Sequence, residues 1–116
     1  MSISTNLSRT FTRIMQIYEV RISHAALVDM ANLRTFLNAM LSEEGAIRYA
    51  NNMRAEIKLL SVYADCFRRT TSKTLLSIHP DARRMVSHNR RWLYVFHIEG
   101  SFVIVDRILP AKMNKG

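Results

Sequence analysis

The chain contains very little cysteine, glycine or proline. Its 116 residues include one cysteine, three glycines and two prolines. The single thiol, Cys66, excludes an intramolecular disulfide framework and a cysteine-rich zinc site, and it suits a reducing cytosol. The scarcity of glycine and proline argues against collagen-like, linker-like and turn-rich all-β designs. We therefore expect a cytoplasmic protein that folds without disulfides.

Long apolar segments are also missing. No run approaches the roughly 18 apolar residues that a membrane span needs, and the first residues lack the apolar block of a secretory signal. No pair among the four histidines has the spacing of metal ligands. We expect no membrane partner, no metal and no other cofactor.

The residues that are present suffice for one packed domain. Hydrophobic side chains make up 48% of the chain, which argues against global disorder. The length suits one domain and leaves no room for two. We expect the domain at residues 16–113. We expect residues 1–15 before it to form an arm or a short helix, because four apolar residues recur there at roughly helical spacing: Ile3, Leu7, Phe11 and Ile14.

Positive charge is concentrated in the second half of the chain. The net charge is +8, but residues 1–67 hold seven basic and six acidic side chains, whereas residues 68–116 hold ten and three. This asymmetry favours a polyanionic partner, such as RNA, DNA or an acidic protein segment. The alternative is a basic surface with no specific partner. The candidate nucleic-acid-binding residues are Arg68, Arg69, Lys73, Arg83 and Arg90.

The first half of the domain predicts a strand followed by two helices. Residues 16–22 alternate between apolar and polar side chains, as a strand with one buried face does. Ser23 is a suitable N-cap, and apolar residues at steps of three and four predict a helix over residues 24–41. Ser42 is the next cap, and a second stripe predicts a helix over residues 43–64. The short link makes these helices a hairpin.

The second half of the domain predicts strands. Residues 73–78 form one expected strand, and residues 83–87 form a short one after a His-Pro-Asp turn. Residues 91–98 and 102–109 are rich in aromatic and β-branched side chains, and a tight Glu-Gly-Ser turn joins them. They are the clearest β-hairpin in the sequence.

This order of elements predicts an α+β fold. The late strands are antiparallel, and the helical hairpin must cover one face of their sheet because nothing else buries both apolar stripes. We expect a small, mostly antiparallel sheet of four to five strands whose other face is free for binding. Trp92, Tyr94 and Phe96 alternate on one strand, and we expect them in the core beneath the helices rather than stacked on bases.

The stretch ARRMVSHNRRWLYVFHIEGSFVIVDRILPAKM combines four features in a fixed order. It has a double arginine, a strand with arginine and tyrosine three apart, an acidic turn, and a last strand that ends in Arg-Ile-Leu. With the earlier strand–Ser–helix segment YEVRISHAALVDMANLRTFL and the second helix, this pattern resembles the RelE/ParE superfamily of bacterial toxin–antitoxin toxins. The resemblance covers about residues 17–113.

The resemblance implies a small basic toxin that a co-encoded antitoxin protein neutralises. The RelE branch implies an enzyme, a ribosome-dependent endoribonuclease that cuts messenger RNA, and we favour this activity. The ParE branch implies a non-cleaving inhibitor of DNA gyrase. A third alternative is a non-catalytic basic module that binds an antitoxin or nucleic acid.

The resemblance also implies site residues. Arg84 resembles the second of the family's paired arginines, and Arg91, three residues before Tyr94, resembles the arginine that stabilises the phosphate. A guanidinium suits that task because its planar fork holds two phosphate oxygens. Strand alternation places Arg91 and Tyr94 on opposite faces unless a bulge intervenes.

Two further residues complete the expected catalytic set. His88 lies beside the arginines and is a candidate general base. Lys112 follows the last strand, where RelE-branch toxins carry C-terminal catalytic residues. Some of those toxins end in a histidine–tyrosine pair, whereas this chain has Pro110 and Ala111 at the matching places. That departure favours the gyrase alternative.

Overall fold

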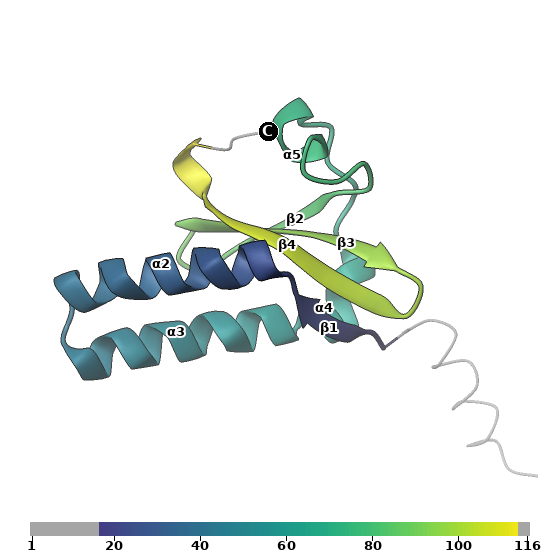
Figure 1. Ribbon diagram of the computed structural model, residues 1–116. Coiled ribbons are helices and arrows are strands. Elements are labelled where there is room, and N and C mark those ends of the chain that lie inside the picture. Colours follow the sequence, from purple (N-terminus) through teal and green to yellow (C-terminus); the bar gives the residue numbers. More distant parts are fainter. Residues whose placement is uncertain (1–16, 114–116) are drawn as a thin grey trace, which may run out of the picture.

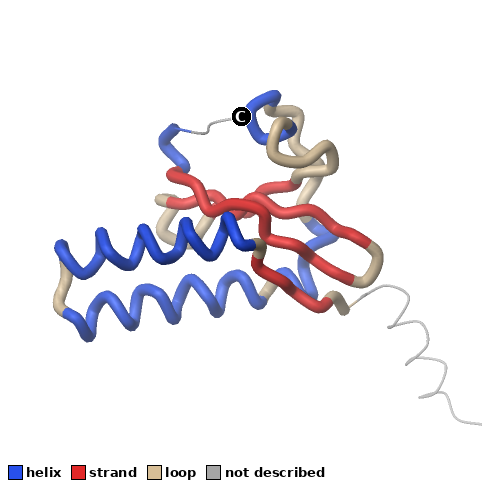
Figure 2. Tube along the Cα trace, in the orientation of Figure 1, coloured by secondary structure: helices blue, strands red, loops and turns tan. Residues whose placement is uncertain are grey.

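A computed structural model describes residues 17–113 as a four-stranded sheet with a helical hairpin on one face (Figures 1 and 2). The elements, in chain order, are β1 (Glu19–Ile22), α2 (His24–Met40), α3 (Glu43–Lys58), α4 (Leu60–Tyr63), η1 (Ala64–Cys66), α5 (Lys73–Leu76), β2 (Arg83–Val86), β3 (Trp92–Glu99), β4 (Phe102–Pro110) and η2 (Ala111–Met113). The arm or helix expected at residues 1–15 lies outside the described residues.

The sheet has the strand order β1-β4-β3-β2. β1 pairs in parallel with β4, while β4 with β3 and β3 with β2 are antiparallel. The α+β class, the N-terminal strand and the mostly antiparallel sheet are therefore confirmed. The hairpin of β3 and β4 closes at Gly100, whose φ of +60° is a conformation that glycine adopts without steric cost.

The first helix begins and ends nearly where its apolar stripe predicts, and the second stops early. Ser23 Oγ accepts the Ala26 N–H and Ser42 Oγ accepts the Gly45 N–H, both at 3.1 Å, so both predicted caps are confirmed. The second helix was expected to run to residue 64, but α3 ends at Lys58. The chain bends there into α4 and η1, and the bend buries Leu60 completely against the sheet.

The prediction of a strand over residues 73–78 is wrong. Residues Lys73–Leu76 form the single helical turn α5, which Ser72 caps by accepting the Leu75 N–H. Leu75 is fully buried against Ala82 and Val95 on the sheet face opposite the helical hairpin. That second face is therefore partly covered by residues 67–82, rather than free as expected.

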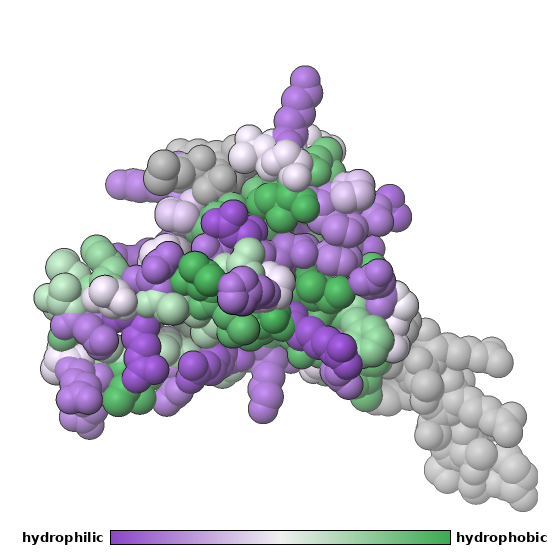
Figure 3. All heavy atoms as spheres, in the orientation of Figure 1, coloured by the Kyte–Doolittle hydropathy of each residue, from purple (hydrophilic) through white to green (hydrophobic). Residues whose placement is uncertain are grey.

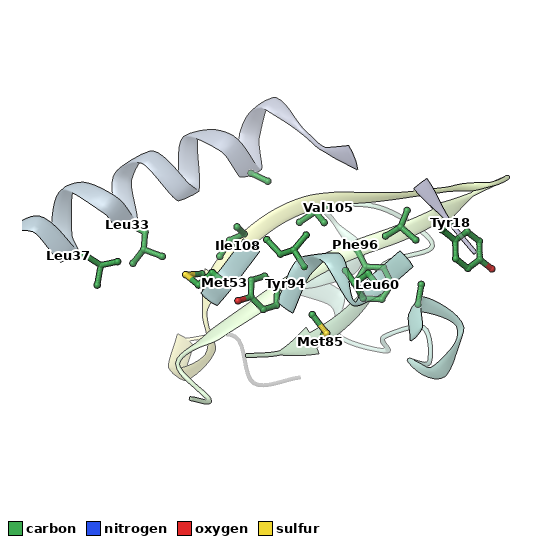
Figure 4. Close-up of a cluster of buried hydrophobic side chains, with 14 of the residues drawn as sticks. Tyr18, Leu33, Leu37, Met53, Leu60, Met85, Tyr94, Phe96, Val105 and Ile108 are labelled. Carbon is green, nitrogen blue, oxygen red and sulfur yellow. The ribbon is translucent and has the colours of Figure 1, made fainter. Parts of the chain in front are cut away.

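The main core lies between the helical hairpin and the sheet (Figure 4). Tyr94 and Phe96 are completely buried, and Trp92 packs against the same cluster, so the aromatic stripe is core as predicted. Leu33 of α2 and Met53 of α3 belong to the same cluster (Figure 4).

A bulge in β4 creates a second, polar layer on the other face. Phe96 pairs with Val105 and Val95 with Arg107, so Asp106 is the extra residue. Its carboxylate lies 2.7 Å from Nδ1 of the buried His97, whose ring stacks on His79 at a centroid distance of 3.6 Å. The bulge thus turns a carboxylate toward a buried imidazole.

Asp29 of α2 completes the open edge of β4. β1 ends at Ile22, opposite Val105, and no strand among residues 17–113 pairs with the outer edge of β4 beyond that point. The Asp29 carboxylate accepts the Ile108 N–H at 2.9 Å, and Arg107 Nε donates to the same oxygen at 2.8 Å. One side chain of the helix therefore replaces the missing strand and locks α2 to the sheet.

Ionisation of Tyr18 at alkaline pH is expected to lower the free energy of unfolding. Burial, helped by the hydrogen bond that its hydroxyl donates to Asp65 at 2.7 Å, raises the pKa of Tyr18 to about 12. In the unfolded chain a tyrosine ionises near pH 10. Stability from this residue is therefore fully present below about pH 10 and is lost as pH rises toward 12.

Denaturant unfolding at pH 8 and pH 11 tests this effect, with Tyr18→Phe as the matched variant. The wild type is expected to lose about 1 kcal/mol more than the variant over this interval, because each unit of pKa shift corresponds to about 1.4 kcal/mol. Equal losses in the two proteins would contradict the role of Tyr18.

Candidate functional site

The loop between β2 and β3, residues 87–91, is a tight turn that we call the basic turn. Arg90 adopts a φ of +64°, a left-handed conformation that is uncommon outside glycine. Its N–H donates to the Ser87 carbonyl at 2.8 Å, and the Arg91 N–H donates to Asn89 Oδ1 at 3.0 Å. The buried Ser87 hydroxyl donates to the same Asn89 oxygen at 2.6 Å. The turn is thus closed by its own side chains.

Two side chains of α3 hold the basic turn from outside. Glu56 Oε2 accepts the His88 N–H at 2.6 Å. The Tyr49 hydroxyl accepts from Asn89 Nδ2 at 2.6 Å and from Trp92 Nε1 at 2.8 Å. These contacts fix the backbone, while the side chains of Arg90 and Arg91 remain exposed. The cations are therefore presented on a preorganised support.

Tyr94 belongs to this support rather than to the exposed surface. It is completely buried, and its hydroxyl donates to Glu56 Oε1 at 3.2 Å. Burial, followed by the neighbouring Glu56 carboxylate, raises the pKa of Tyr94 well above its usual value, so the phenol stays protonated. Its contact with the basic turn runs through Glu56, which also holds His88.

Arg90, Arg91 and Lys112 surround one hollow of about 470 Å³. The Ala111 N–H donates to the Arg91 carbonyl at 2.9 Å, which ties η2 to the basic turn and brings Lys112 close although it is 21 positions away. Within residues 17–113, no carboxylate lies at ion-pair distance from these three cations. The arrangement suits an anionic ligand, either a phosphate or a carboxylate.

The other predicted site residues lie elsewhere. Arg84 is half-buried in β2 opposite Val95. That position is four residues from Arg91, roughly 13 Å along the strand. Arg83 donates to the Phe67 carbonyl at 2.7 Å and so braces the chain before β2.

The remaining basic candidates lie on the segment that covers the second sheet face. Arg69 is 3.5 Å from Asp81, while Arg68 and Lys73 are exposed. The structure therefore gathers Arg90, Arg91 and Lys112, with His88 on the same turn, and leaves Arg68, Arg69, Lys73, Arg83 and Arg84 outside.

Sequence reasoning missed the residues that organise this site. Tyr49 and Glu56 are seven positions apart, which places them on the same side of a helix. That spacing is the only sequence signal for them, because Glu56 falls outside the apolar stripe of α3. Phe36, which lines the hollow with more than half of its surface exposed, gave no signal either.

Two absences in the described part of the chain bear on the kind of site. No helix between residues 17 and 113 is long and apolar enough to cross a membrane. The same residues contain no group of three or more histidine, cysteine, aspartate or glutamate side chains that could hold a metal ion.

Comparison with known proteins places the fold. No protein-family model matches the chain, and no curated protein sequence matches it. A solved structure described as "Chromosomal ParDE TA system from P. aeruginosa" is similar, with a TM-score of 0.69 and 15% sequence identity, over 82% of this chain and 97% of that one. The chain therefore has a ParE-like α+β fold, as the sequence resemblance implied.

Proposed function

We propose that this protein is the toxin of a toxin–antitoxin pair and that it binds its cellular target through the basic turn. The observation that carries the proposal is the cluster of Arg90, Arg91 and Lys112, exposed and free of carboxylate partners among the described residues, on a ParE-like fold. A toxin with this surface requires an antitoxin protein as its partner in the cell.

Inhibition of DNA gyrase is the activity that the site favours. Acid–base catalysis needs titratable groups that reach the substrate. Tyr94 is buried, and Pro110 and Ala111 stand where other toxins of the superfamily carry such groups. A toxin that acts by binding needs only the preorganised cations, which this site has.

Cleavage of messenger RNA on the ribosome is the second candidate, and His88 is the observation that favours it. Its exposed imidazole stands on the same turn as the two arginines. In this mechanism His88 would take the proton of the 2′-hydroxyl as that oxygen attacks the phosphate. Arg91 and Lys112 would stabilise the charge on the phosphate, and the 5′-oxygen would leave with a proton from water.

Induced expression in a bacterial host separates these outcomes. After induction, the experiment follows four quantities together: growth, incorporation of labelled methionine, transcript integrity and chromosome breakage. We expect arrest with intact transcripts and broken chromosomes. Rapid loss of translation with cut transcripts would show that the target is messenger RNA and not gyrase. Normal growth with soluble, folded protein would overturn the toxin proposal.

A further inference from the structure

Residues 67–82, which we call the cover segment, lie on the sheet face opposite the helical hairpin (Figure 1). Hydrophilic and neutral side chains dominate the outward side of this segment (upper right in Figure 3). Its inward apolar contact is small, because it consists mainly of Leu75 and Ala82 packed on Val95. Local stability follows buried apolar contact, so the cover segment opens at a lower cost than the main core.

Two histidine rings join the cover segment to the sheet. The ring of His79 stacks on the ring of His97 in β3, with the ring centroids 3.6 Å apart and the ring planes 5° apart. His97 is buried, with 5% of its surface exposed. We call these two residues the histidine pair. The pair places two titratable groups face to face where the cover segment meets the sheet.

The hydrogen bonding of His79 requires a neutral ring. Its Nδ1 accepts the Asp81 N–H at 3.0 Å, and its carbonyl accepts the Ala82 N–H at 3.1 Å. These two bonds close the turn that leads into β2. A protonated imidazole carries a hydrogen on both nitrogens and accepts no hydrogen bond. Uptake of a proton by His79 therefore removes the acceptor of the Asp81 N–H.

His97 can carry a charge without losing a partner. Its Nδ1 lies 2.7 Å from Asp106 Oδ2, and its Nε2 lies 3.7 Å from Glu99 Oε2. Both nitrogens of a protonated ring are donors. A charged His97 therefore has a carboxylate facing each of its two N–H groups.

The remaining charges around the histidine pair leave His79 without a counter-charge. The other charged side chains already have partners: Asp81 with Arg69 at 3.5 Å, Arg83 with the Phe67 carbonyl at 2.7 Å, and Arg21, across β4 from His97, with Glu19 at 2.8 Å. Among residues 17–113, no carboxylate lies at ion-pair distance from His79. A charge on that ring therefore faces the charge of His97.

We propose that the histidine pair is an acid-sensitive switch that releases the cover segment from the sheet. At pH 8 the His79 ring is neutral, so the stack and the Asp81 hydrogen bond hold. Toward pH 5 both rings take up a proton, the hydrogen bond is lost, and two like charges lie face to face. The cover segment then opens, while β3, β4 and the helical hairpin stay folded. This switch does not depend on the protein's being a toxin.

Hydrogen exchange of the full-length chain, followed by NMR at pH 7.5 and pH 5.0, tests the switch. Protection factors, which correct for the intrinsic effect of pH on exchange, are compared between two sets of amides. In the cover segment, at Thr70, Asp81 and Ala82, we expect protection to fall about tenfold at pH 5.0, the effect of one lost hydrogen bond. In β3 and β4 protection should stay within about twofold.

His79→Asn is the matched variant. An asparagine side chain can accept the N–H two residues ahead, but it takes up no proton in this pH range. Protection of its cover segment should therefore be equal, within about twofold, at the two pH values. His24→Gln removes an exposed histidine at the start of α2 and should behave as the wild type does.

The wild type supplies a measurement that does not rely on a variant. The NMR signals of both rings, followed from pH 8 to pH 5, report the two protonation steps of the pair. Loss of protection should accompany the step in which His79 becomes charged. Four results would overturn the switch: equal protection at both pH values in the wild type, an equal loss in His79→Asn, a loss that precedes protonation of His79, or an equal loss throughout β3 and β4.

Discussion

Replacing Arg90 and Arg91 together by glutamate is expected to abolish toxicity while leaving the domain folded. Both side chains are exposed and have no carboxylate partner among residues 17–113, so the fold does not depend on them. A hydrogen bond to a charged group is worth about 1.5–3 kcal/mol. Losing two such contacts weakens target binding by about two to four orders of magnitude. The readout is survival of the host after induction at equal protein levels.

The matched control is Arg54→Glu with Lys58→Glu, which changes the net charge equally on exposed positions of α3. It should remain toxic. Arrest by a folded double-glutamate variant of the basic turn would show that toxicity does not use these cations. Arg84→Ala then decides between the two placements of the site, because loss of toxicity in that variant alone would move the site onto β2.

Replacing Asp29 by alanine is expected to reduce the free energy of unfolding by about 3 kcal/mol. The change removes the acceptor of the Ile108 N–H and of two Arg107 nitrogens at once. The hydrogen bonds that Arg107 donates to Asp29 raise the pKa of the guanidinium. An arginine is also protonated without such a partner, so the substitution leaves its charge uncompensated. Denaturant unfolding at neutral pH measures the loss.

Asp29→Asn provides the graded control. Its amide oxygen can still accept the Ile108 N–H, so about half of the loss is expected. A loss below about 1 kcal/mol in Asp29→Ala would mean that water satisfies both groups and that α2 is held by its apolar contacts alone.

The elements that the sequence predicted correctly are those with strong local signals. Ser23 and Ser42 each precede an apolar stripe of helical period, so the first residues of both helices could be predicted from the sequence. The strands around Gly100 carry dense β-branched and aromatic residues. Residues 73–78 lack such a signal, because a short apolar run fits a strand and a helical turn equally. The packing of Leu75 against the sheet, which the sequence does not reveal, favours the helical turn over a strand.

The site was predicted only in outline. Charge asymmetry indicated a cationic second half, but strand pairing and turn geometry decide which cations meet. Lys112 lies near Arg91 because the neighbouring Ala111 N–H donates to the Arg91 carbonyl, 20 positions earlier in the sequence. Tyr94 stands three positions after Arg91, and the alternation of the strand directs it into the core. The spacing that resembles the family suggested that Arg91 and Tyr94 share one site. The alternation of side chains along the strand instead directs them to opposite faces of the sheet.

The parallel pairing of β1 with β4 makes completion of this domain depend on the end of its synthesis. Glu19 pairs with Phe102, so β1 leaves the ribosome well before the strand that it pairs with has been made. Until then the apolar stripes of α2 and α3 can cover only the pair of strands β2 and β3. Such long-range pairing folds late. A chain whose translation stops before β4 cannot close its core, and an aborted product would therefore carry the arginines of the basic turn without the fold that presents them.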